Sequence, residues 1–398
     1  MKGIKIVIFV GRNITMIHTI KFKNYKSFKE EQTLEIKPIT ILIGINSAGK
    51  SAITKLPTLL SNSLQGNFSE PLKLNNGGVE LGAEFRDLVY GRTRLGKLEF
   101  SLEDDNEKLG IVIGSGPRSA DSPEIFSWTF KSKEKTEELE YADARSFKGF
   151  HANLGRAESA IKSLSINTDY IGPFRVLPER QYNDLKKVSG KHIGIKGENT
   201  YPIIIRDALS LEQNLLNQVS EWYKKSFEGW GLKVNADSDP FYQLELTRGN
   251  GDVNINFRDV GQGMSQLLPI VTRAFMPTDE ETLIVIEQPE LHLHPSAHGD
   301  VAELLVDTLD IGNKKYLIET HSQNFILRIR ALIASKKISH NDVSLYYVKF
   351  NSETDSSSLE KITIDQIGNV DHWPKGIFDE ALLETIAIRT AQQELRVK

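Results

Sequence analysis

The chain has 398 residues, of which 39% are hydrophobic and 26% charged, a globular balance with enough apolar residues for a sizeable core. Its formal net charge of -4 shows no basic excess, so composition alone does not indicate a nucleic-acid-binding protein. It has no cysteine, which excludes disulfides, thiolate catalysis and cysteine-ligated metals and fits a cytoplasmic location.

The N-terminal segment is too short and too broken to be a membrane span. Its apolar residues 4–10 are interrupted by Lys5 and followed by Gly11 and Arg12. A spanning helix needs about 20 apolar residues, and no other stretch approaches that length, so we expect no membrane partner. Met16 offers a second start, so residues 1–15 are predicted to be an extension, disordered or produced by an early start site, before one head over residues 16–398.

Strands and helices alternate along the chain. Strands are predicted at 16–23, 32–37 and 39–43, a helix at 50–62, short strands over 79–130, helix in the charged segment 131–165 and again at 207–228. Residues 248–251 (RGNG) indicate a hairpin turn between strands around 241–258. From residue 261 a loop, helix and strand order repeats, as in a parallel sheet, and residues 343–350 and 359–364 are predicted to be its last strands.

These elements predict an α/β fold with a core parallel sheet, an antiparallel β lobe near the N-terminus and a helical lobe before residue 261. We place an insertion lobe at about residues 80–260.

The clearest motif is Gly44-Ile45-Asn46-Ser47-Ala48-Gly49-Lys50-Ser51, which matches G-x-x-x-x-G-K-[ST] between a strand and a helix. The glycines let backbone N–H groups close around phosphate oxygens, and the helix N-terminus adds a favourable dipole. The sequence therefore predicts ATP and Mg²⁺ as cofactors, with Lys50 on the β- and γ-phosphates and Ser51 on the metal. The residues predicted to bind nucleotide here are Asn46, Ser47, Ala48, Gly49, Lys50, Ser51 and Ala52. The alternative is a glycine-rich turn that matches by chance.

An apolar strand ending in an acid comes much later, at residues 282–287 (TLIVIE). A carboxylate at such a strand end is where ATPases hold Mg²⁺, so Glu287 is predicted to bind the metal together with Ser51.

Two further loops carry candidate residues. The strand 316–319 leads into Thr320-His321-Ser322, where His321 is placed to contact a γ-phosphate and Ser322 to cap the next helix. The loop 261–265 (GQGMS) precedes an apolar helix, and we expect Gly263 and Ser265 to contact phosphate. The alternative for this loop is a simple turn.

In this order the four motifs resemble the heads of ABC-type ATPases, including SMC and RecF-like proteins, and most of all the bacterial OLD-like AAA ATPases. The resemblance runs through FKNYKSF (22–28), GINSAGKS (44–51), YIGPFR (170–175), GQGMSQLLPI (261–270), IEQPELHLHP (286–295), ETHS (319–322) and residues 364–380. It implies an ABC-type P-loop head that sandwiches ATP in a homodimer or higher homo-oligomer. Gly261, Gly263 and Ser265 of one head would cap the γ-phosphate bound to the other, and His321 would be the switch histidine.

The chain departs from the ABC pattern at the catalytic pair. ABC heads carry an Asp for Mg²⁺ and then a Glu that polarises water, whereas this chain has Glu287 and Gln288. Glutamine cannot accept a proton, and a general base is worth roughly 10²–10⁴-fold in rate. Either Glu290 or another carboxylate takes over, or the protein hydrolyses ATP slowly and stays closed; we favour slow turnover. The candidate catalytic residues are Glu287, Gln288, Glu290 and His321.

Two other assignments depend on the same resemblance. Asp87 stands roughly where the Q-loop residue is expected. The histidines of the HLHP segment (His292 and His294) and His298 are interpreted as a family feature and not as a zinc site.

The resemblance also bears on what the head drives. The residues after His321 contain no Asp-x-Asp, and residues 52–260 show no sustained heptads, so neither a Toprim nuclease nor a coiled-coil arm is predicted. We expect a bare head that controls a separate effector such as a nuclease, in bacterial anti-phage defence. The alternatives are a RecF-like DNA-binding repair ATPase and a nucleotide-sensing scaffold. DNA is a candidate partner through lysines 21, 23, 26 and 29, although a solvated strand face explains them better.

Overall fold

The computed structural model describes residues 15–116, 119–132, 136–140, 147–152, 164–183, 185, 190–249, 251, 253–374, 376–378 and 380–397. The extension predicted for residues 1–15 lies outside these residues except for Thr15. No helix in the described ranges has the length and apolar character that a membrane crossing requires.

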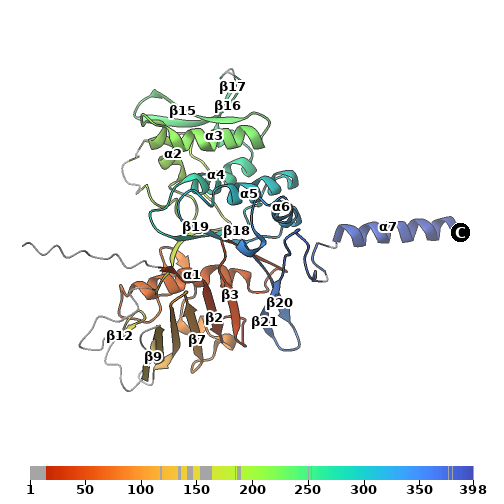
Figure 1. Ribbon diagram of the computed structural model, residues 1–398. Helices are drawn as coiled ribbons and strands as arrows, with labels where there is room; N and C mark the ends of the chain where they lie inside the picture. Colours follow the sequence, from red (N-terminus) through yellow and green to blue (C-terminus); the bar gives the residue numbers. More distant parts are fainter. Residues whose placement is uncertain are drawn as a thin grey trace, which may run out of the picture.

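A mostly parallel sheet of six strands forms the centre of the molecule (Figure 1). Its order is β14 (Asn167–Ile171), β18 (Thr282–Glu287), β19 (Lys314–Glu319), β4 (Ile39–Gly44), β20 (Val343–Asn351) and β21 (Ser356–Ile362). All neighbours run parallel except β20 and β21. Strands β4 and β18 are buried along their whole length, which explains why they read as continuous apolar runs. The predicted core parallel sheet is confirmed.

The two faces of this sheet belong to two separate cores. On β18, Ile284 and Ile286 pack into one core, whereas Leu283 and Val285 point to the other. The first face is covered by α4 (Gln262–Phe275), α5 (Pro295–Asp307) and α6 (Gln323–Ala334), and the second by α1 (Lys50–Gln65), as Figure 1 shows.

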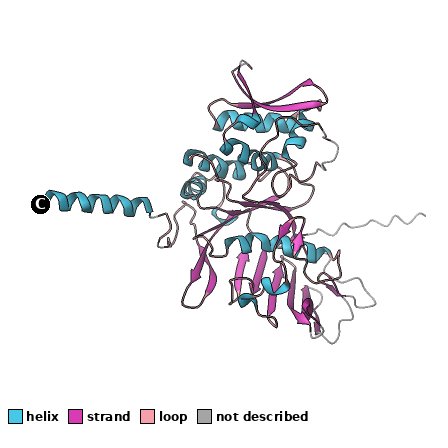
Figure 2. Ribbon diagram, turned by 180° about the vertical axis from the view of Figure 1, so that it is seen from behind, coloured by secondary structure: helices cyan, strands magenta, loops and turns pink. Residues whose placement is uncertain are grey.

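An antiparallel sheet lies on the far side of α1 (Figure 2). Its order is β10 (Thr136–Glu140), β9 (Ser119–Ser132), β8 (Glu107–Gly116), β7 (Lys97–Glu103), β2 (Thr19–Lys23) and β3 (Gln32–Glu35). Ile53 and Leu56 of α1 share one core with Phe22 and Trp128 of this sheet, so α1 is held between two sheets. Small strands complete the lobe: β1 (Thr15–Met16), β5 (Asn75–Asn76), β6 (Val79–Glu80), β11 (Phe147–Lys148), β12 (His151–Ala152) and β13 (Leu164–Ser165).

The helix predicted over residues 131–165 is wrong wherever this segment is described. Its charged residues 136–140 form the edge strand β10, which pairs with residues 127–131 of β9. Charged side chains are tolerated on an edge strand, and pairing with a neighbour overrides the weak local preference for helix.

A helical lobe with its own small sheet lies above α4 in Figure 1. It contains α2 (Thr200–Ala208), α3 (Asn214–Ser226) and the antiparallel strands β15 (Gly231–Ser238), β16 (Phe241–Arg248) and β17 (Val253–Asn256). The predicted hairpin is β16–β17. Residues 80–260 contribute to both lobes and, through β14, to the central sheet, and their grouping as one insertion lobe stays a prediction. Helix α7 (Glu380–Val397) extends away from the rest of the molecule.

Candidate functional site

The P-loop connects β4 to α1 at the carboxyl edge of the central sheet. Residues 45–47 are exposed, and α1 begins at Lys50 without a side-chain cap and without an acidic residue in its first turn. The N–H groups at the start of this helix therefore face no competing anion of their own helix, which suits a phosphate.

Two glycines of this loop are required by its geometry. Gly44 has φ 152°, and a Cβ there would lie 2.5 Å from the carbonyl oxygen of Val348. Gly49 has φ 102°, and its Cβ would lie 2.6 Å from Ser27 Oγ and 3.1 Å from the ring of Phe28. The segment 22–28 therefore packs directly against the P-loop. This contact explains why the FKNYKSF motif occurs together with the P-loop.

Lys50 is buried and turned back onto its own loop. Its Nζ donates to the carbonyl oxygens of Gly44 at 3.0 Å and Ile45 at 2.8 Å. Burial lowers the pKa of Lys50, while Glu319 and Glu290 act in the opposite direction. The ammonium therefore lies inside the loop, where the phosphates of a nucleotide are expected.

Two buried carboxylates lie beside this loop, at the ends of neighbouring strands. Glu287 of β18 and Glu319 of β19 are paired in register. Thr54 Oγ1 donates to Glu287 Oε1 at 2.5 Å, and Ser51 Oγ donates to Glu319 Oε2 at 3.0 Å. Burial and the charge of Glu287 raise the pKa of Glu319 to about 7. Glu319 was not among the predicted site residues, although its position at the end of an apolar strand, like that of Glu287, was a usable signal.

Glu290 reaches across to the loop after β19. Its Oε1 accepts a hydrogen bond from the backbone N–H of His321 at 2.6 Å, and its buried Oε2 has no hydrogen-bond partner among the described residues. Burial raises the pKa of Glu290. Burial, assisted by Lys50, lowers the pKa of His321. The structure thus brings the predicted Glu287, Glu290, His321 and P-loop together.

Gln288 holds an unusual backbone conformation between these acids. It has φ 46°, in the left-handed region, and its N–H donates to the carbonyl oxygen of Glu319 at 2.7 Å. Ser322 caps α6 by accepting from the N–H of Phe325 at 3.0 Å, which confirms the predicted cap.

The loop 261–265 is not joined to the P-loop of its own chain by any hydrogen bond recorded in the described residues. Gly261 and Gln262 are exposed, and Gly261 gives α4 no side-chain cap. Ser265 is 1% exposed, and its Oγ donates to the carbonyl oxygen of Gln262 at 3.1 Å. A Cβ on Gly263 would lie 2.5 Å from the carbonyl oxygen of His292, so this loop rests on the HLHP segment. The phosphate-binding roles of Gly263 and Ser265 stay predictions.

Two histidines of the HLHP region, His294 and His298, make local hydrogen bonds. His294 caps α5 through a bond from the N–H of Ser296, and His298 Nδ1 lies 2.7 Å from Ser322 Oγ. Within the described ranges no group of three or more His, Cys, Asp and Glu side chains is arranged to hold a metal.

Asp87, Lys23 and Lys26 are engaged in local contacts. Asp87 accepts from the N–H groups of Ala83 and Glu84, and backbone bonds of this kind, above all from Glu84, lower its pKa. Lys26 Nζ donates to the carbonyl oxygen of Leu81, and Lys23 pairs with Glu99 at 3.3 Å. Two of the four lysines suggested for DNA binding therefore already contact groups of the protein itself.

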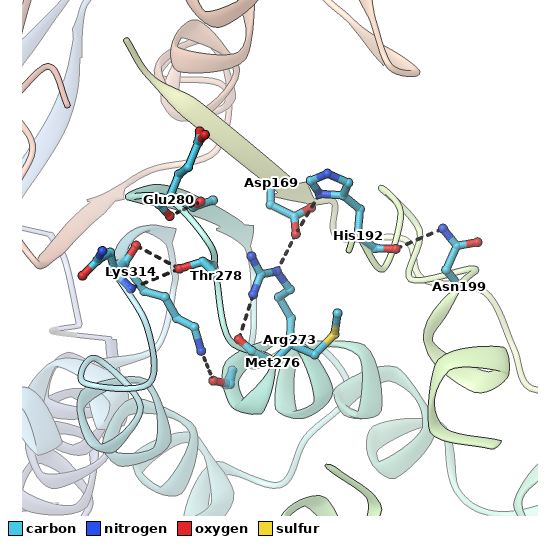
Figure 3. Close-up of polar contacts among 11 residues, drawn as sticks. Asp169, His192, Asn199, Arg273, Met276, Thr278, Glu280 and Lys314 are labelled. Carbon is cyan, nitrogen blue, oxygen red and sulfur yellow. Dashed lines mark hydrogen bonds and ion pairs between the residues drawn. The ribbon is translucent and has the colours of Figure 1, made fainter. Parts of the chain in front are cut away.

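A second polar cluster lies at the opposite edge of the sheet (Figure 3). Asp169, His192 and Arg273 of this cluster line a cavity of about 1000 Å³. Arg273 Nε donates to Asp169 Oδ2 at 2.5 Å, and His192 Nδ1 lies 3.6 Å from the same oxygen. Burial opposes ionisation of Asp169, but His192 and Arg273 outweigh it and keep the pKa of Asp169 below its ordinary value. This cluster ties α4 to β14 and the loop at residue 192, and its charges are already paired.

Comparison with protein families gives two matches. The AAA_21 family, described as "AAA domain, putative AbiEii toxin, Type IV TA system", matches residues 39–328. A family of unknown function, DUF3696, matches residues 338–386.

Curated relatives include two nucleases and a phosphatase. The OLD nuclease of Thermus scotoductus is 24% identical over 87% of this chain and 66% of its own length. The Old nuclease of Escherichia phage P2 is 23% identical over 77% of this chain and 56% of its own length. The ATP/GTP phosphatase of Helicobacter pylori is 24% identical over 82% of this chain and 90% of its own length. The chain thus spans less than two thirds of the two nucleases it matches.

Solved structures with a similar arrangement include SMC heads. The SMC head bound to the C-terminal winged-helix domain of ScpA aligns over 88% of this chain and 98% of its own, with 11% identity and a TM-score of 0.46. The SMC head of Thermotoga maritima aligns over 88% and 100%, with 10% identity and a TM-score of 0.43.

The AAA_21 match covers well over half of the chain and contains the P-loop, the acid-ended strands and the loop at residue 261. The chain therefore belongs to the AAA_21 family of AAA domains, and it is similar to OLD nucleases and to an ATP/GTP phosphatase.

Proposed function

We propose that the chain binds Mg²⁺ and ATP at its P-loop, hydrolyses ATP slowly, and uses ATP-dependent closure of two heads to control a separate nuclease in defence against phage. The observation that carries this proposal is the P-loop lying beside the two register-paired carboxylates Glu287 and Glu319. Each carboxylate accepts a hydrogen bond from a hydroxyl group of α1. The helix that begins at the P-loop therefore also fixes the position of the two acids.

The residues beside the P-loop fit a hard divalent cation. Ser51 supplies a hydroxyl oxygen, and Glu287 and Glu319 supply carboxylate oxygens, which are the ligands that Mg²⁺ prefers. These three residues would hold Mg²⁺, which neutralises phosphate charge when it is bound. Mg²⁺ keeps several waters and shares phosphate oxygens in such sites, so few protein ligands suffice.

Slow turnover is supported by the residue that follows Glu287. Gln288 cannot act as a base, which leaves Glu290 as the neighbouring acid with an unpartnered oxygen. Its raised pKa makes it a better proton acceptor near neutral pH than an ordinary glutamate. The test is the ATPase rate of Glu290→Gln and Gln288→Glu. We expect the first to lose activity and the second to gain it, and unchanged rates in both would contradict these roles.

Closure of two heads is supported by two helix starts that have no side-chain cap. Helix α1 begins at the P-loop and α4 at the exposed Gly261, and neither has a side-chain cap. An anion bound at the first helix start can be covered by the second from another chain.

Light scattering of the purified chain tests the dimer. We expect a monomer without nucleotide, a dimer with Mg²⁺ and ATP, a longer-lived dimer for Glu290→Gln, and no dimer for Lys50→Ala. The same mass under all four conditions would refute ATP-dependent closure.

The effector proposal draws on the relatives, two of which are named nucleases and are longer than this chain. The tagged chain is purified with the products of neighbouring genes, with and without ATP, and DNA cleavage by the complex is measured with Lys50→Ala as the control. We expect an ATP-dependent companion with nuclease activity. Salt-sensitive DNA binding by the chain alone, with no companion, would favour the RecF-like repair function instead.

A further inference from the structure

Arg175 is a buried arginine that connects three parts of the site. It follows β14 in the GPFR segment and is 5% exposed, whereas its neighbour Phe174 is 80% exposed. The segment carries part of the family resemblance, but its sequence alone predicts no role for Arg175.

The backbone of Arg175 is fixed to the helix α4. Its N–H donates to Gln266 Oε1 at 3.1 Å, and Gln266 Nε2 donates back to the carbonyl oxygen of Arg175 at 2.9 Å. This reciprocal pair uses both ends of the Gln266 amide, so two hydrogen bonds hold the GPFR segment (residues 172–175) to α4.

The guanidinium of Arg175 is fixed to the end of β18. Its Nη2 donates to the carbonyl oxygens of Glu287 at 2.7 Å and Gln288 at 3.3 Å, and its Nη1 lies 3.5 Å from the carbonyl oxygen of Gln266. The planar guanidinium therefore contacts the backbone of α4 and the backbone of residues 287 and 288 at the same time. The Gln288 carbonyl belongs to a residue in the left-handed region, where a small change of backbone angle redirects the following residues.

A role in stability alone does not account for this arginine. Its Nε is buried and without a hydrogen-bond partner in the described part of the chain, and no carboxylate forms an ion pair with it there. A buried charge held only by carbonyl groups costs free energy compared with an apolar side chain of similar size. Burial lowers the pKa of Arg175 to about 10, so it keeps its charge at neutral pH beside Glu290 and Glu287.

We infer that Arg175 is a positioning residue that transmits the position of α4 to the carboxylates of the ATP site. Resting on the proposed closure of two heads, the consequence is that a nucleotide covered by α4 in one site aligns Glu287 and Glu290 in the other.

The test compares Arg175→Met, Arg175→Lys and Gln266→Ala with Arg180→Met. Arg180 is an exposed arginine shortly after the GPFR segment, and it pairs with Asp259. We expect kcat of Arg175→Met to fall about 10- to 100-fold, while the Kd for ATP changes less than about threefold. Lysine has one ammonium in place of the planar fork, so Arg175→Lys should recover part of kcat. Arg180→Met should match the wild type.

A double-mutant cycle separates coupling from loss of folding. If Arg175 acts through Gln266, the double variant loses no more kcat than Arg175→Met alone, whereas independent structural damage would multiply the two losses. Melting temperatures accompany each variant, and Arg175→Lys and Gln266→Ala carry the test if Arg175→Met does not fold.

Failure of this inference is distinguishable from failure of the proposed dimer. An Arg175→Met protein that still dimerises with ATP and keeps wild-type kcat and Hill coefficient overturns the inference and leaves the dimer intact. A wild type that never dimerises refutes the dimer, and a lowered kcat of Arg175→Met with unchanged Kd then supports coupling within one chain.

Discussion

Replacing Glu319 by glutamine should stabilise the nucleotide-free protein at alkaline pH. Burial and the charge of Glu287 raise the pKa of Glu319 from its ordinary value of 4.5 to about 7. The folded state holds this proton more tightly than the unfolded state. The stabilisation that protonated Glu319 contributes to the wild type is therefore fully present below about pH 4.5 and is lost as pH rises toward 7. The shift corresponds to about 3 kcal/mol, and glutamine removes it because it is neutral at every pH.

The variant also loses part of the hydrogen bond from Ser51, worth about 1 kcal/mol. We therefore expect Glu319→Gln to be about 2 kcal/mol more stable than the wild type at pH 8 and no more stable at pH 5. Urea unfolding in EDTA without nucleotide measures both values, with the exposed Glu353→Gln as the control. A difference between variant and wild type that is the same at pH 5 and pH 8 would refute the electrostatic reasoning.

Adding Mg²⁺ and ATP should make the wild type more stable than Glu319→Gln at pH 8, which reverses the order of the two proteins. A ligand that binds only the folded state adds RT ln(1 + [L]/Kd) to stability, and the variant binds it more weakly if Glu319 helps to hold the metal. Equal stabilisation of both proteins by Mg²⁺ and ATP would show that Glu319 is not a metal ligand.

Three other substitutions should have defined effects. Burial and Arg273 lower the pKa of Lys314 to about 7, so the stability of the wild type rises between pH 7 and pH 10.5. Lys314→Met removes this pH dependence and should raise the free energy of unfolding at pH 7 by on the order of 3 kcal/mol. Urea unfolding at pH 7 and pH 10.5 measures both effects. Ser322→Ala removes the cap of α6 and should cost about 1 kcal/mol in the same assay. Gly44→Ala places a Cβ 2.5 Å from the Val348 carbonyl oxygen and should abolish ATP binding by calorimetry, and normal affinity would show that the loop tolerates the shift.

The P-loop was predictable because its signals are local. The apolar strand 39–43, the glycines and the following helix are all read within about 25 residues, and the structure places them as β4, the loop and α1. The loop at 261 and the strand ending at Glu287 were predictable for the same reason.

Glu319 and Arg175 were not predicted as site residues because their proposed roles depend on contacts between segments that are distant in the sequence. Glu319 matters because β19 pairs with β18 in a register that sets it opposite Glu287. Arg175 matters because β14 lies at the other side of β18, which brings the GPFR segment to the start of α4. The charged strand β10 was mistaken for a helix because only its partner β9 distinguishes the two.

The charges at the carboxyl edge of the sheet favour a switch that is set by nucleotide. Glu287, Glu290 and Glu319 share this edge with Lys50, and the raised pKa values of Glu290 and Glu319 show that burial makes their ionisation costly in the folded chain. On the proposed function, a divalent cation brought by ATP would offset that cost, and its binding energy would fix the acids and, through Arg175, the helix α4. With Gln288 in place of a base, we expect this fixed arrangement to last as long as ATP remains, which is the property that control of an effector requires.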